Sequence, residues 1–487
     1  MRRGLAMIAG NETEATKRDL SVRTKINTQP EFDFQPSNLQ VTNDYFERYE
    51  AISRILDQNP AIVGLAHRDL EAALVPTGDD GRAGYCRFTS DTILRILICQ
   101  ILEGESLRGT VIRVDDGSYL RRFTRIYNGP MVDFTHLCRL KNCITAETWK
   151  RINDSLARFA VEEKRIEGER LRIDTTAFET NIHWPTDSSL LWDTYRVLAR
   201  EIERLREVAP TLVGNRHLQT KRVKRIALRI ARASNKRGKT PKNLKPLYKQ
   251  LLGHVRAILA LAAEIIDVTR SPEWSTSQLG LERTQGTLER YMTLGLQIVD
   301  QARRRVLEGE SVPNDEKLFS IFEEHTELLI RGKAGKPIEF GHMVEIEQVD
   351  SKFISGYDVY RKRPTDSSLV MPALERHAKL FGRDPKVLAA DKGYYGAADN
   401  LAQVRDRVEL VAIPKPGGRT EAEKQRERSF AFKIGQQFRA GVEGSISFLK
   451  RALGMCRCLS KGWDHYRATV GATVFAHNLV VLARGYG

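Results

Sequence analysis

The chain has 487 residues, a formal net charge of +16 and a pI near 9.5. Hydrophobic residues make up 41% of it and aromatic residues 8%, which is typical of a soluble protein with a packed core and excludes a fibrous or fully disordered chain. The length exceeds that of one ordinary domain, so we expect roughly two or three. No apolar run reaches the ~18 residues that a membrane helix needs, so we expect no membrane partner.

Six cysteines are scattered along the chain without a repeated Cys-x-x-Cys pair. This spacing argues against a structural zinc site, and so few thiols in so long a chain are typical of a reduced, cytoplasmic protein. The basic charge favours a polyanionic partner, because Lys and Arg contacts to phosphates release counterions. We therefore expect the protein to be cytoplasmic and to act bound to DNA.

The first half of the chain is expected to be helical. Residues 1–42 are polar without clear periodicity and predict a flexible N-terminal arm. Residues 43–167 follow a helical pattern and predict an all-helical N-terminal DNA-binding domain, in which Thr89-Ser90-Asp91 marks a helix start. Exposed arginines, Arg125 among them, could dock on DNA. A helix-turn-helix and a plain packing module both remain open for this domain.

Residues 168–487 predict an α/β domain, because runs of strands are followed by alternating strands and helices. A mixed sheet is expected. Its predicted strands cover residues 170–179, 338–346, 353–360, 386–391 and 409–413, and the segment 181–185 could pair with the first of them. Predicted helices cover residues 368–381, 396–405 and 466–483, and another carries Glu443.

A helical pattern at about residues 188–330 interrupts this domain and predicts a large basic insertion. Between Glu207 and Glu264 there is no acidic residue, whereas Lys and Arg are frequent. A charge run is usually a solvated helix face, but one without compensating acids repels itself unless a polyanion is near. We therefore expect DNA contacts from this insertion, including contacts from Lys221, Arg222, Lys224 and Arg225.

Three acidic residues are candidates for binding divalent cations. Asp174 lies within an apolar strand, Asp391 ends another, and Glu443 lies on a helix. A carboxylate is costly to bury alone but tolerable beside a cation, and hard divalent cations such as Mg²⁺ prefer oxygen ligands. Two such ions can clamp both oxygens of an in-line displacement at phosphorus.

Each of these residues also has an ordinary explanation. Asp174 could cap a turn, Asp391 could begin one, and Glu443 could form a surface helix pair with Arg439. Taken together, their order and element types favour one site.

Four stretches resemble sequence motifs of the DDE transposases of bacterial insertion sequences, most closely those of the ISNCY group. They are Ile173-Asp174-Thr175-Thr176, residues 182–191 (IHWPTDSSLL), Ala390-Asp391-Lys392-Gly393-Tyr394, and the spaced set Arg439-x₃-Glu443-x₆-Lys450. The resemblance covers roughly residues 80–485. It implies an RNase H-like catalytic domain and a helical N-terminal domain.

The resemblance also implies roles for individual residues. Asp174, Asp391 and Glu443 would be the catalytic, metal-binding triad for two Mg²⁺ ions, or Mn²⁺ in their place. Arg439 and Lys450 would contact phosphates of the transposon end, which agrees with the helix face that they share with Glu443. Related families place a Tyr three residues before the Arg, where this chain has Gln436.

The implied reaction is DNA transposition. The enzyme would bind the terminal inverted repeats of an insertion sequence, cleave the double-stranded DNA in a Mg²⁺-dependent step, and transfer the strands to target DNA. Because two ends must be joined together, a homodimer is expected in the synaptic complex. Tyr394 or Tyr395 could stack on an unpaired base near the cleavage point, or be a packed strand-end aromatic. Two alternatives remain: an RNase H-like nuclease or resolvase that cuts without joining, and a catalytically inactive DNA-binding protein.

Overall fold

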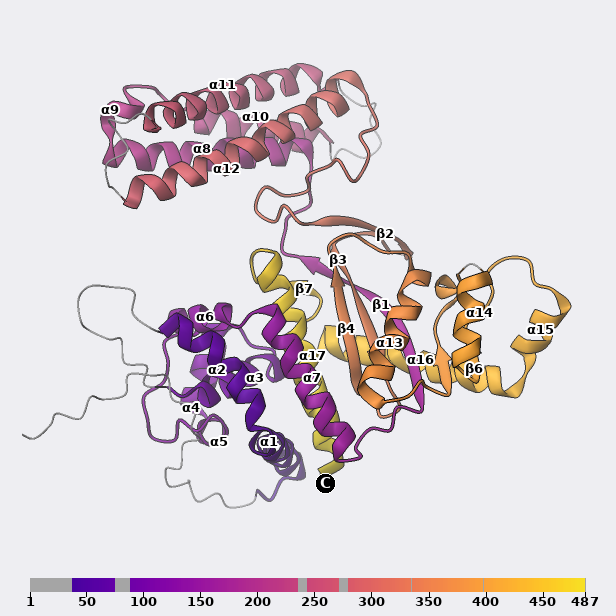
Figure 1. Cartoon of the computed structure of the whole chain (residues 1–487). Helices are drawn as coiled ribbons and strands as arrows, with labels where there is room; N and C mark the ends of the chain where they lie inside the picture. Colours follow the sequence, from indigo (N-terminus) through magenta and orange to yellow (C-terminus); the bar gives the residue numbers. More distant parts are fainter. Residues whose placement is uncertain are drawn as a thin grey trace, which may run out of the picture. The chain divides into compact units, whose positions relative to one another are not determined.

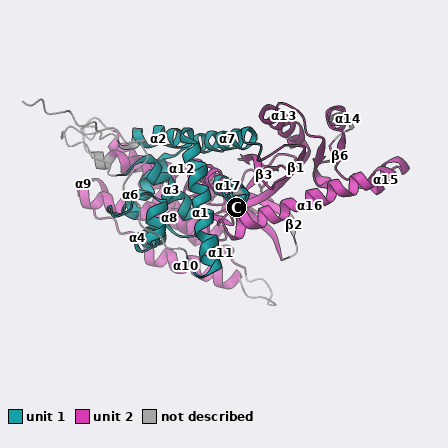
Figure 2. Cartoon of the chain, turned by 90° about the horizontal axis from the view of Figure 1, so that it is seen from below, with its two compact units in different colours: residues 1–165, 475–487 teal, residues 166–474 magenta. Residues whose placement is uncertain are grey.

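The computed structural model describes residues 37–74, 88–234, 243–270, 279–333, 335–396 and 398–486 (Figure 1). The chain divides into two compact units, which are residues 1–165 with 475–487, and residues 166–474 (Figure 2). The N-terminal arm expected at residues 1–42 lies mostly outside the described residues, and the first helix begins at Gln40. No helix within the described ranges is long and apolar enough to cross a bilayer.

The first unit is helical. Thr89 is the N-cap of one of its helices, where its side chain accepts a hydrogen bond from the Thr92 amide, as the sequence predicts. The helices are α1 (Gln40–Gln58), α2 (Pro60–Leu74), α3 (Ser90–Leu102), α4 (Leu107–Asp116), α5 (Ser118–Phe123), α6 (Phe134–Cys143) and α7 (Ala146–Glu162).

The expectation that Arg125 is exposed and could contact DNA is wrong, because its side chain is buried. Its guanidinium pairs with Asp91 at 2.8 Å and with Asp57, and both of these carboxylates also pair with the buried Arg95. Burying a charge is tolerable when opposite charges and hydrogen bonds surround it. Arg125 therefore holds helices together and is not available to DNA.

The last helix, α17 (Trp463–Ala483), changes unit along its length. Its first turns belong to the second unit, where the Tyr466 hydroxyl donates a hydrogen bond to the Phe178 carbonyl. From Phe475 onward the chain belongs to the first unit, and the Phe475 ring lies 5.8 Å from that of Trp149. The sequence predicts one domain over residues 168–487, whereas the boundary between the compact units falls at Phe475, within α17.

The second unit is built on a mixed sheet, so the α/β prediction is confirmed. The order is β2-β3-β1-β5-β6, with β4 beside β3 and β7 beside β1. β3 is antiparallel to β1, β2 and β4, whereas β5 and β7 are parallel to β1 and β6 is parallel to β5. The strands are β1 (Arg170–Thr180), β2 (Glu327–Lys333), β3 (Lys336–Gln348), β4 (Ile354–Tyr360), β5 (Val387–Ala389), β6 (Leu410–Ala412) and β7 (Arg457–Cys458).

Two strands, β2 and β7, were not predicted. One predicted pairing is also absent: residues 181–186 form no strand and lead directly into the next helix.

Helices cover both faces of the sheet. On one face, α13 (Val370–Phe381) and α14 (Ala398–Arg407) share a core with Leu171, Ile173 and Leu388. On the other face lies α16 (Phe430–Arg451), whose Phe432 and Phe438 pack on Ala389 and Ala412. Side chains alternate between the two faces of a strand, so residues on one face of β1 meet α13 and those on the other face meet α16. A short helix, α15 (Glu421–Arg428), precedes α16.

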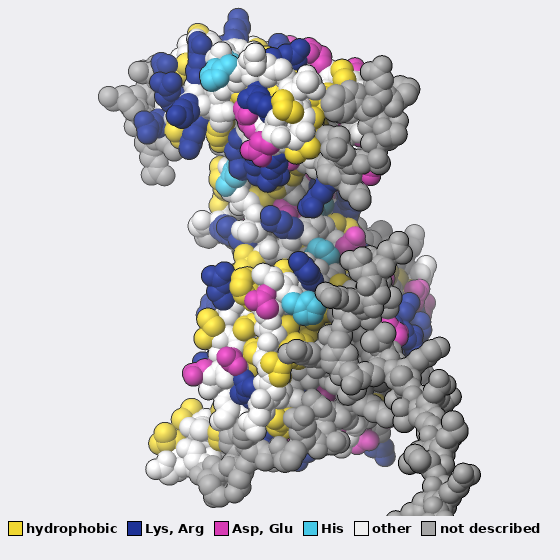
Figure 3. Space-filling model, turned by 90° about the vertical axis from the view of Figure 1, so that its left-hand side faces the viewer, with side chains coloured by type: hydrophobic (Ala, Val, Ile, Leu, Met, Phe, Trp, Pro, Cys, Tyr) yellow, Lys and Arg dark blue, Asp and Glu magenta, His cyan; other side chains and the backbone are white. Residues whose placement is uncertain are grey.

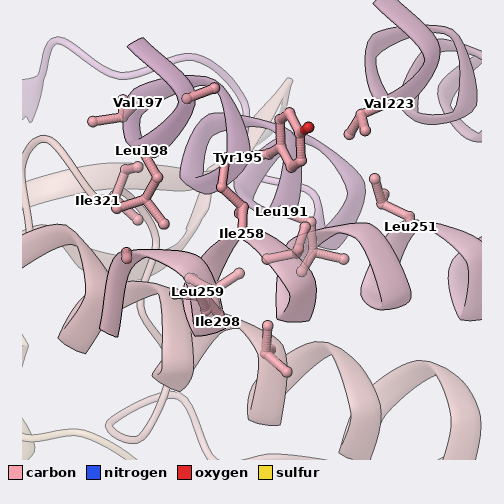
Figure 4. Close-up of a cluster of buried hydrophobic side chains, with 14 of the residues drawn as sticks. Leu191, Tyr195, Val197, Leu198, Val223, Leu251, Ile258, Leu259, Ile298 and Ile321 are labelled. Atoms are coloured by element: carbon pink, nitrogen blue, oxygen red, sulfur yellow. The ribbon is translucent and has the colours of Figure 1, made fainter. Parts of the chain in front are cut away.

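A helical bundle separates β1 from β2 in the sequence. It consists of α8 (Asp187–Val208), α9 (Pro210–Val213), α10 (Thr220–Ser234), α11 (Lys245–Thr269) and α12 (Leu279–Ala302), followed by a π-helical turn at Arg303–Glu308. Leu191 and Leu198 of α8 pack with Ile258 of α11 and Ile298 of α12 in its core (Figure 4). The bundle buries its own apolar residues. It occupies the place where the sequence predicts an insertion.

The packing of α16 on the sheet gives a first prediction. A Cβ at Gly435 would lie 2.5 Å from Ala412 Cβ, whereas nothing lies within 4 Å of one at Gly444 on the same helix. We expect Gly435→Ala to lower the free energy of unfolding by about 1–3 kcal/mol, because the added methyl overpacks the helix–sheet contact. Gly444→Ala should raise it by about 0.5–1 kcal/mol through helix propensity alone. Urea unfolding followed by circular dichroism measures both, and equal effects would contradict the assigned packing.

Candidate active site

Asp174 and Asp391 lie on adjacent strands. Arg172 of β1 pairs in register with Ala389 of the parallel strand β5. Asp174 lies two residues beyond Arg172, inside the central strand β1, and Asp391 lies two residues beyond Ala389, just past the end of β5, so the register makes them neighbours. Asp174 Oδ1 accepts a hydrogen bond from the Thr175 amide at 2.7 Å. Asp391 caps a short 3-10 helix, η3 (Lys392–Tyr394), and accepts from the Gly393 amide at 2.7 Å.

A buried arginine ties α16 to this part of the sheet. Arg172 Nε donates to Gln348 Oε1 of β3 at 2.8 Å, and its Nη1 donates to the Phe438 carbonyl of α16 at 2.5 Å. The guanidinium also lies 4.6 Å from the centre of the Phe438 ring. Burial lowers the pKa of Arg172 to about 10, so it remains charged at neutral pH.

Two further hydrogen bonds fix the direction in which α16 crosses the sheet. Gln348 Nε2 donates to Ser445 Oγ at 2.8 Å, and Gln436 Nε2 donates to the Ala390 carbonyl at 3.1 Å. Ala390 directly precedes Asp391. The flank of α16 that carries Gln436 therefore faces the end of β5. Gln436, which stands where related families have a Tyr, holds the helix to that strand.

Glu443 lies on this same flank, two helical turns after Gln436, because residues seven apart share a helix face. Its side chain is 67% exposed and accepts a hydrogen bond from Arg439 Nη2 at 3.2 Å. Within the described ranges, no three Asp, Glu, His or Cys side chains are arranged to hold a metal ion. The structure thus places the two aspartates on adjacent strands and packs the helix of Glu443 on one face of the sheet. It does not gather the three carboxylates into one ligand group.

The residues present nevertheless fit a hard divalent cation. Asp174, Asp391 and Glu443 offer oxygen donors only, which is the donor type that Mg²⁺ and Mn²⁺ prefer. The exposed Glu443 side chain is held by one surface ion pair, and such pairs stabilise by only about 0–1 kcal/mol. Rotating Glu443 toward a cation therefore costs little.

The structure adds an acidic residue that the sequence did not single out. Asp366 begins the 3-10 helix η2 (Asp366–Leu369), which contacts η3. A Cβ at Gly393 would lie 3.0 Å from Asp391 Oδ1 and 3.1 Å from Asp366 Oδ2. Two carboxylates from distant parts of the sequence therefore flank one point. The sequence offered no signal for this, because Asp366 stands in a polar stretch before a helix.

The prediction that Tyr394 stacks on an unpaired DNA base is contradicted. Its side chain is 1% exposed and packs in the core with Ile173, Leu369 and Val370. Burial raises the pKa of Tyr394 well above its usual value, and the nearby Asp174, Asp366 and Glu345 raise it further. A buried ring offers no open face to a base, so the packed strand-end aromatic is the better interpretation.

Other buried carboxylates near Asp174 have structural partners. Glu345 and Glu347 of β3 both pair with Arg376 of α13, which also reaches Asp358 at 3.1 Å. The Tyr360 hydroxyl donates to Glu345 at 2.5 Å. Arg376 is shared by three carboxylates on the α13 face, so it offsets only part of their charge. Burial raises the pKa of Glu345.

The basic residues expected to bind DNA lie mainly on α10. Lys221, Arg222, Lys224 and Arg225 are exposed, and within the described ranges none pairs with an Asp or Glu. The opposite side of the helix is buried through Val223, Ile226, Ala227 and Ile230. Figure 3 shows Lys and Arg side chains gathered over the bundle, at the top of the view. Burial and then the positive charge of Arg222 lower the pKa of His254 on α11.

The two basic residues expected beside the triad both lie on α16. The Arg439 side chain is 22% exposed and pairs with Glu443. Lys450 lies in the last turn of the helix and is half-buried. Both belong to the flank that carries Glu443, so a polyanion bound at this flank could meet them together.

Comparisons of the chain with protein-family models, with curated proteins and with solved structures find no match.

Replacing Arg172 tests the connection between α16 and β1. We expect Arg172→Met to lower the free energy of unfolding by about 2–4 kcal/mol, because Gln348 Oε1 and the Phe438 carbonyl lose their buried donor. The control is Arg451→Met, an exposed arginine at the end of α16, for which we expect a change within about 0.5 kcal/mol. Urea unfolding measures both. A loss at Arg172 no larger than that of the control would contradict its role.

Proposed function

We propose that the protein is a DNA transposase of the DDE type, which cleaves the ends of an insertion sequence and transfers them to target DNA. The observation that carries the proposal is the pairing register of β1 and β5. It makes Asp174 and Asp391 neighbours on adjacent parallel strands, while Arg172 and Gln436 hold the Glu443 helix against the same sheet.

The sheet supports the proposed RNase H-like fold of the catalytic domain. Along β4-β3-β1-β5-β6, only β3 runs against the other strands, and helices lie on both faces. Such a mixed sheet agrees with that fold. The bundle between β1 and β2 leaves this arrangement intact, because its hydrophobic core is its own.

Each residue of the proposed site would have one role in the reaction. Two divalent ions bound by Asp174, Asp391 and Glu443 would activate the attacking oxygen and stabilise the leaving one at the phosphorus. Arg439 would exchange its pair with Glu443 for a DNA phosphate, which a guanidinium can hold through two hydrogen bonds. Lys450 would contact a further phosphate. Breaking the Arg439–Glu443 ion pair costs little free energy, because the Glu443 side chain is largely exposed.

The exposed basic face of α10 is proposed to hold the DNA duplex away from the cutting site. Its cations lack acidic partners, so phosphates would relieve their mutual repulsion. Joining two ends in one reaction calls for two copies of the enzyme, so we propose a homodimer on DNA.

The catalytic assignment is tested with DNA taken from both flanks of the coding region, incubated with the full chain and Mg²⁺. We expect cleavage at the element ends and strand-transfer products. Asp391→Asn should reduce both by at least ~10³-fold, equivalent to roughly 4 kcal/mol of barrier, because it removes an anionic oxygen ligand. Asp406→Asn, at an exposed position on α14, is the matched control and should act like the wild type.

Each other outcome of that assay has a defined meaning. Unchanged cleavage by Asp391→Asn would contradict the proposed site. Cleavage without transfer of a labelled, pre-cut end would identify a nuclease that cuts without joining. Binding of the end DNA with neither reaction would identify an inactive DNA-binding protein.

The role of α10 is tested by charge reversal. We expect Lys221→Glu with Lys224→Glu to weaken duplex binding and to reduce the slope of log K against log salt by about 0.9 for each phosphate that the helix no longer neutralises. Lys379→Glu with Arg405→Glu makes the same change of charge at exposed positions on α13 and α14 and should have a smaller effect. Fluorescence anisotropy with a labelled duplex gives both slopes. Equal slopes for the two double variants would contradict a DNA contact at α10.

A further inference from the structure

Two buried histidines form a chain of hydrogen bonds beside the sheet. His325 lies just before β2 and His342 lies on β3. His325 Nδ1 lies 2.8 Å from His342 Nε2, and His325 Nε2 lies 3.0 Å from Glu323 Oε2. At the other end, His342 Nδ1 lies 3.1 Å from the Tyr360 carbonyl oxygen. We call these four groups the histidine chain. The three side chains are buried, so a mismatch of donors and acceptors among them would be costly.

The Tyr360 carbonyl sets the direction of the hydrogen bonds in the histidine chain. A carbonyl oxygen can only accept, so His342 Nδ1 carries a proton. Burial, and then the neighbouring His325, lower the pKa of His342 to about 3. The His342 ring is therefore neutral at neutral pH, and its Nε2 is an acceptor. It follows that His325 Nδ1 donates to His342.

Glu323 decides the state of the remaining nitrogen. If His325 were neutral as well, its Nε2 would carry only a lone pair and would face the lone pairs of a carboxylate. The contact is a hydrogen bond only if His325 carries a second proton or Glu323 is a neutral acid. Glu323 Oε2 also accepts a hydrogen bond from the Gly462 amide at 2.9 Å. An oxygen that accepts two hydrogen bonds matches a carboxylate better than the hydroxyl of an acid, which favours a charged His325 ring.

The histidine chain is in contact with the start of α17. Gly462, whose amide Glu323 accepts, directly precedes Trp463, the first residue of that helix. The centre of the His325 ring lies 5.5 Å from that of Trp463 and 5.6 Å from that of Tyr466. The first turns of α17 are therefore attached to the sheet through the Glu323–His325 pair and through these ring contacts.

Titratable groups on other elements lie around the histidine chain without belonging to it. They are Arg361 after β4, Tyr466 on α17, Cys458 on β7 and Glu179 on β1. The positive charge of Arg361 contributes to the lowered pKa of His342. Burial raises the pKa of Tyr466 well above its usual value, so its hydroxyl keeps its proton. Glu179 pairs with two basic side chains. The carboxylate in hydrogen-bond contact with His325 is that of Glu323.

We propose that His325 is a buried imidazolium whose pair with Glu323 fastens the start of α17 to the sheet, and that loss of its Nε2 proton releases this helix end. Without that proton the ring presents a lone pair to the carboxylate, so Glu323 turns away and the Gly462 amide loses its acceptor. The attachment is present while the ring carries both protons and is lost as the pH rises. From Phe475 onward α17 belongs to the first unit, so the released end is part of the helix that both units share.

The charge of His325 is tested with the full-length protein labelled with ¹⁵N in its histidine rings. All ten histidines lie in the described residues, and His325 with His342 is the pair that shares a hydrogen bond among them. Magnetic coupling across that bond identifies both rings without a variant. At neutral pH we expect protons on both ring nitrogens of His325 and on one of His342. A single proton on the His325 ring would overturn the proposal.

Glu323→Gln should convert His325 to the neutral ring. An amide nitrogen can donate to the lone pair of His325 Nε2, while the amide oxygen still accepts from Gly462. Glu324→Gln is the matched control, because Glu324 is the neighbouring residue and is exposed. It should leave both protons on His325. Loss of the second proton in both variants would overturn the assignment of Glu323 as the partner.

The release of α17 is tested by hydrogen exchange of residues 460–470, read by mass spectrometry from about pH 6 to about pH 9, across the ordinary titration of a histidine ring. After correction for the intrinsic exchange rate, we expect the protection of this segment in the wild type to fall about 10-fold or more, because a hydrogen bond to a charged group is lost. Glu324→Gln should follow the wild type, whereas Glu323→Gln should keep its protection. An equal fall in all three proteins would overturn the release. If Glu323→Gln fails to fold, as judged by circular dichroism, the ring nitrogens of the wild type still decide whether His325 is charged.

Discussion

The buried guanidinium of Arg172 is the interaction on which the candidate site depends. It lies on β1 two residues before Asp174, hydrogen-bonds to Gln348 of β3, and reaches the Phe438 carbonyl on α16. Three elements that are distant in sequence are thereby held in one arrangement. The cost of burying this charge appears as a lowered pKa. It is offset by hydrogen bonds and by the Phe438 ring, which is why a polar residue occupies a place where an aliphatic one would pack more simply.

The charged residues of the protein fall into two groups, buried ion pairs and exposed basic residues. Buried ions such as Arg376 with Glu345 and Glu347, or Arg125 with Asp91, are paired and connect helices and strands. The basic residues of α10 are exposed and have no acidic partner within the described ranges. Such unpaired positive charge on one helix favours a polyanionic partner, because bound phosphates relieve the mutual repulsion of the cations.

Much of the fold could be predicted from the chain itself. The strand around Asp174, the cap at Thr89 and the amphipathic helices have local signals, namely alternation, capping chemistry and helical spacing. β7 is only two residues long and owes its existence to pairing with the end of β1, so no local pattern could reveal it. The segment 181–185 resembles a strand locally, yet the fold uses it to enter α8. Arg125 was expected to be exposed, and Tyr394 was left open between stacking on a base and packing in the core. Both are buried, which the residue type alone could not reveal.

The amino-acid sequence by itself determined most of the helices and the longer strands, the basic stretch without acids, and the choice of Asp174, Asp391 and Glu443 as candidates, because these depend on neighbours along the chain. Only the tertiary structure decided which side chains meet. It showed that Asp174 and Asp391 lie on adjacent parallel strands, that Glu443 pairs with Arg439 on α16, and that Asp366 and Asp391 both lie near Gly393. The physical reason is that strand register and helix packing are set by burial of the whole core, a non-local quantity that no single stretch of sequence contains.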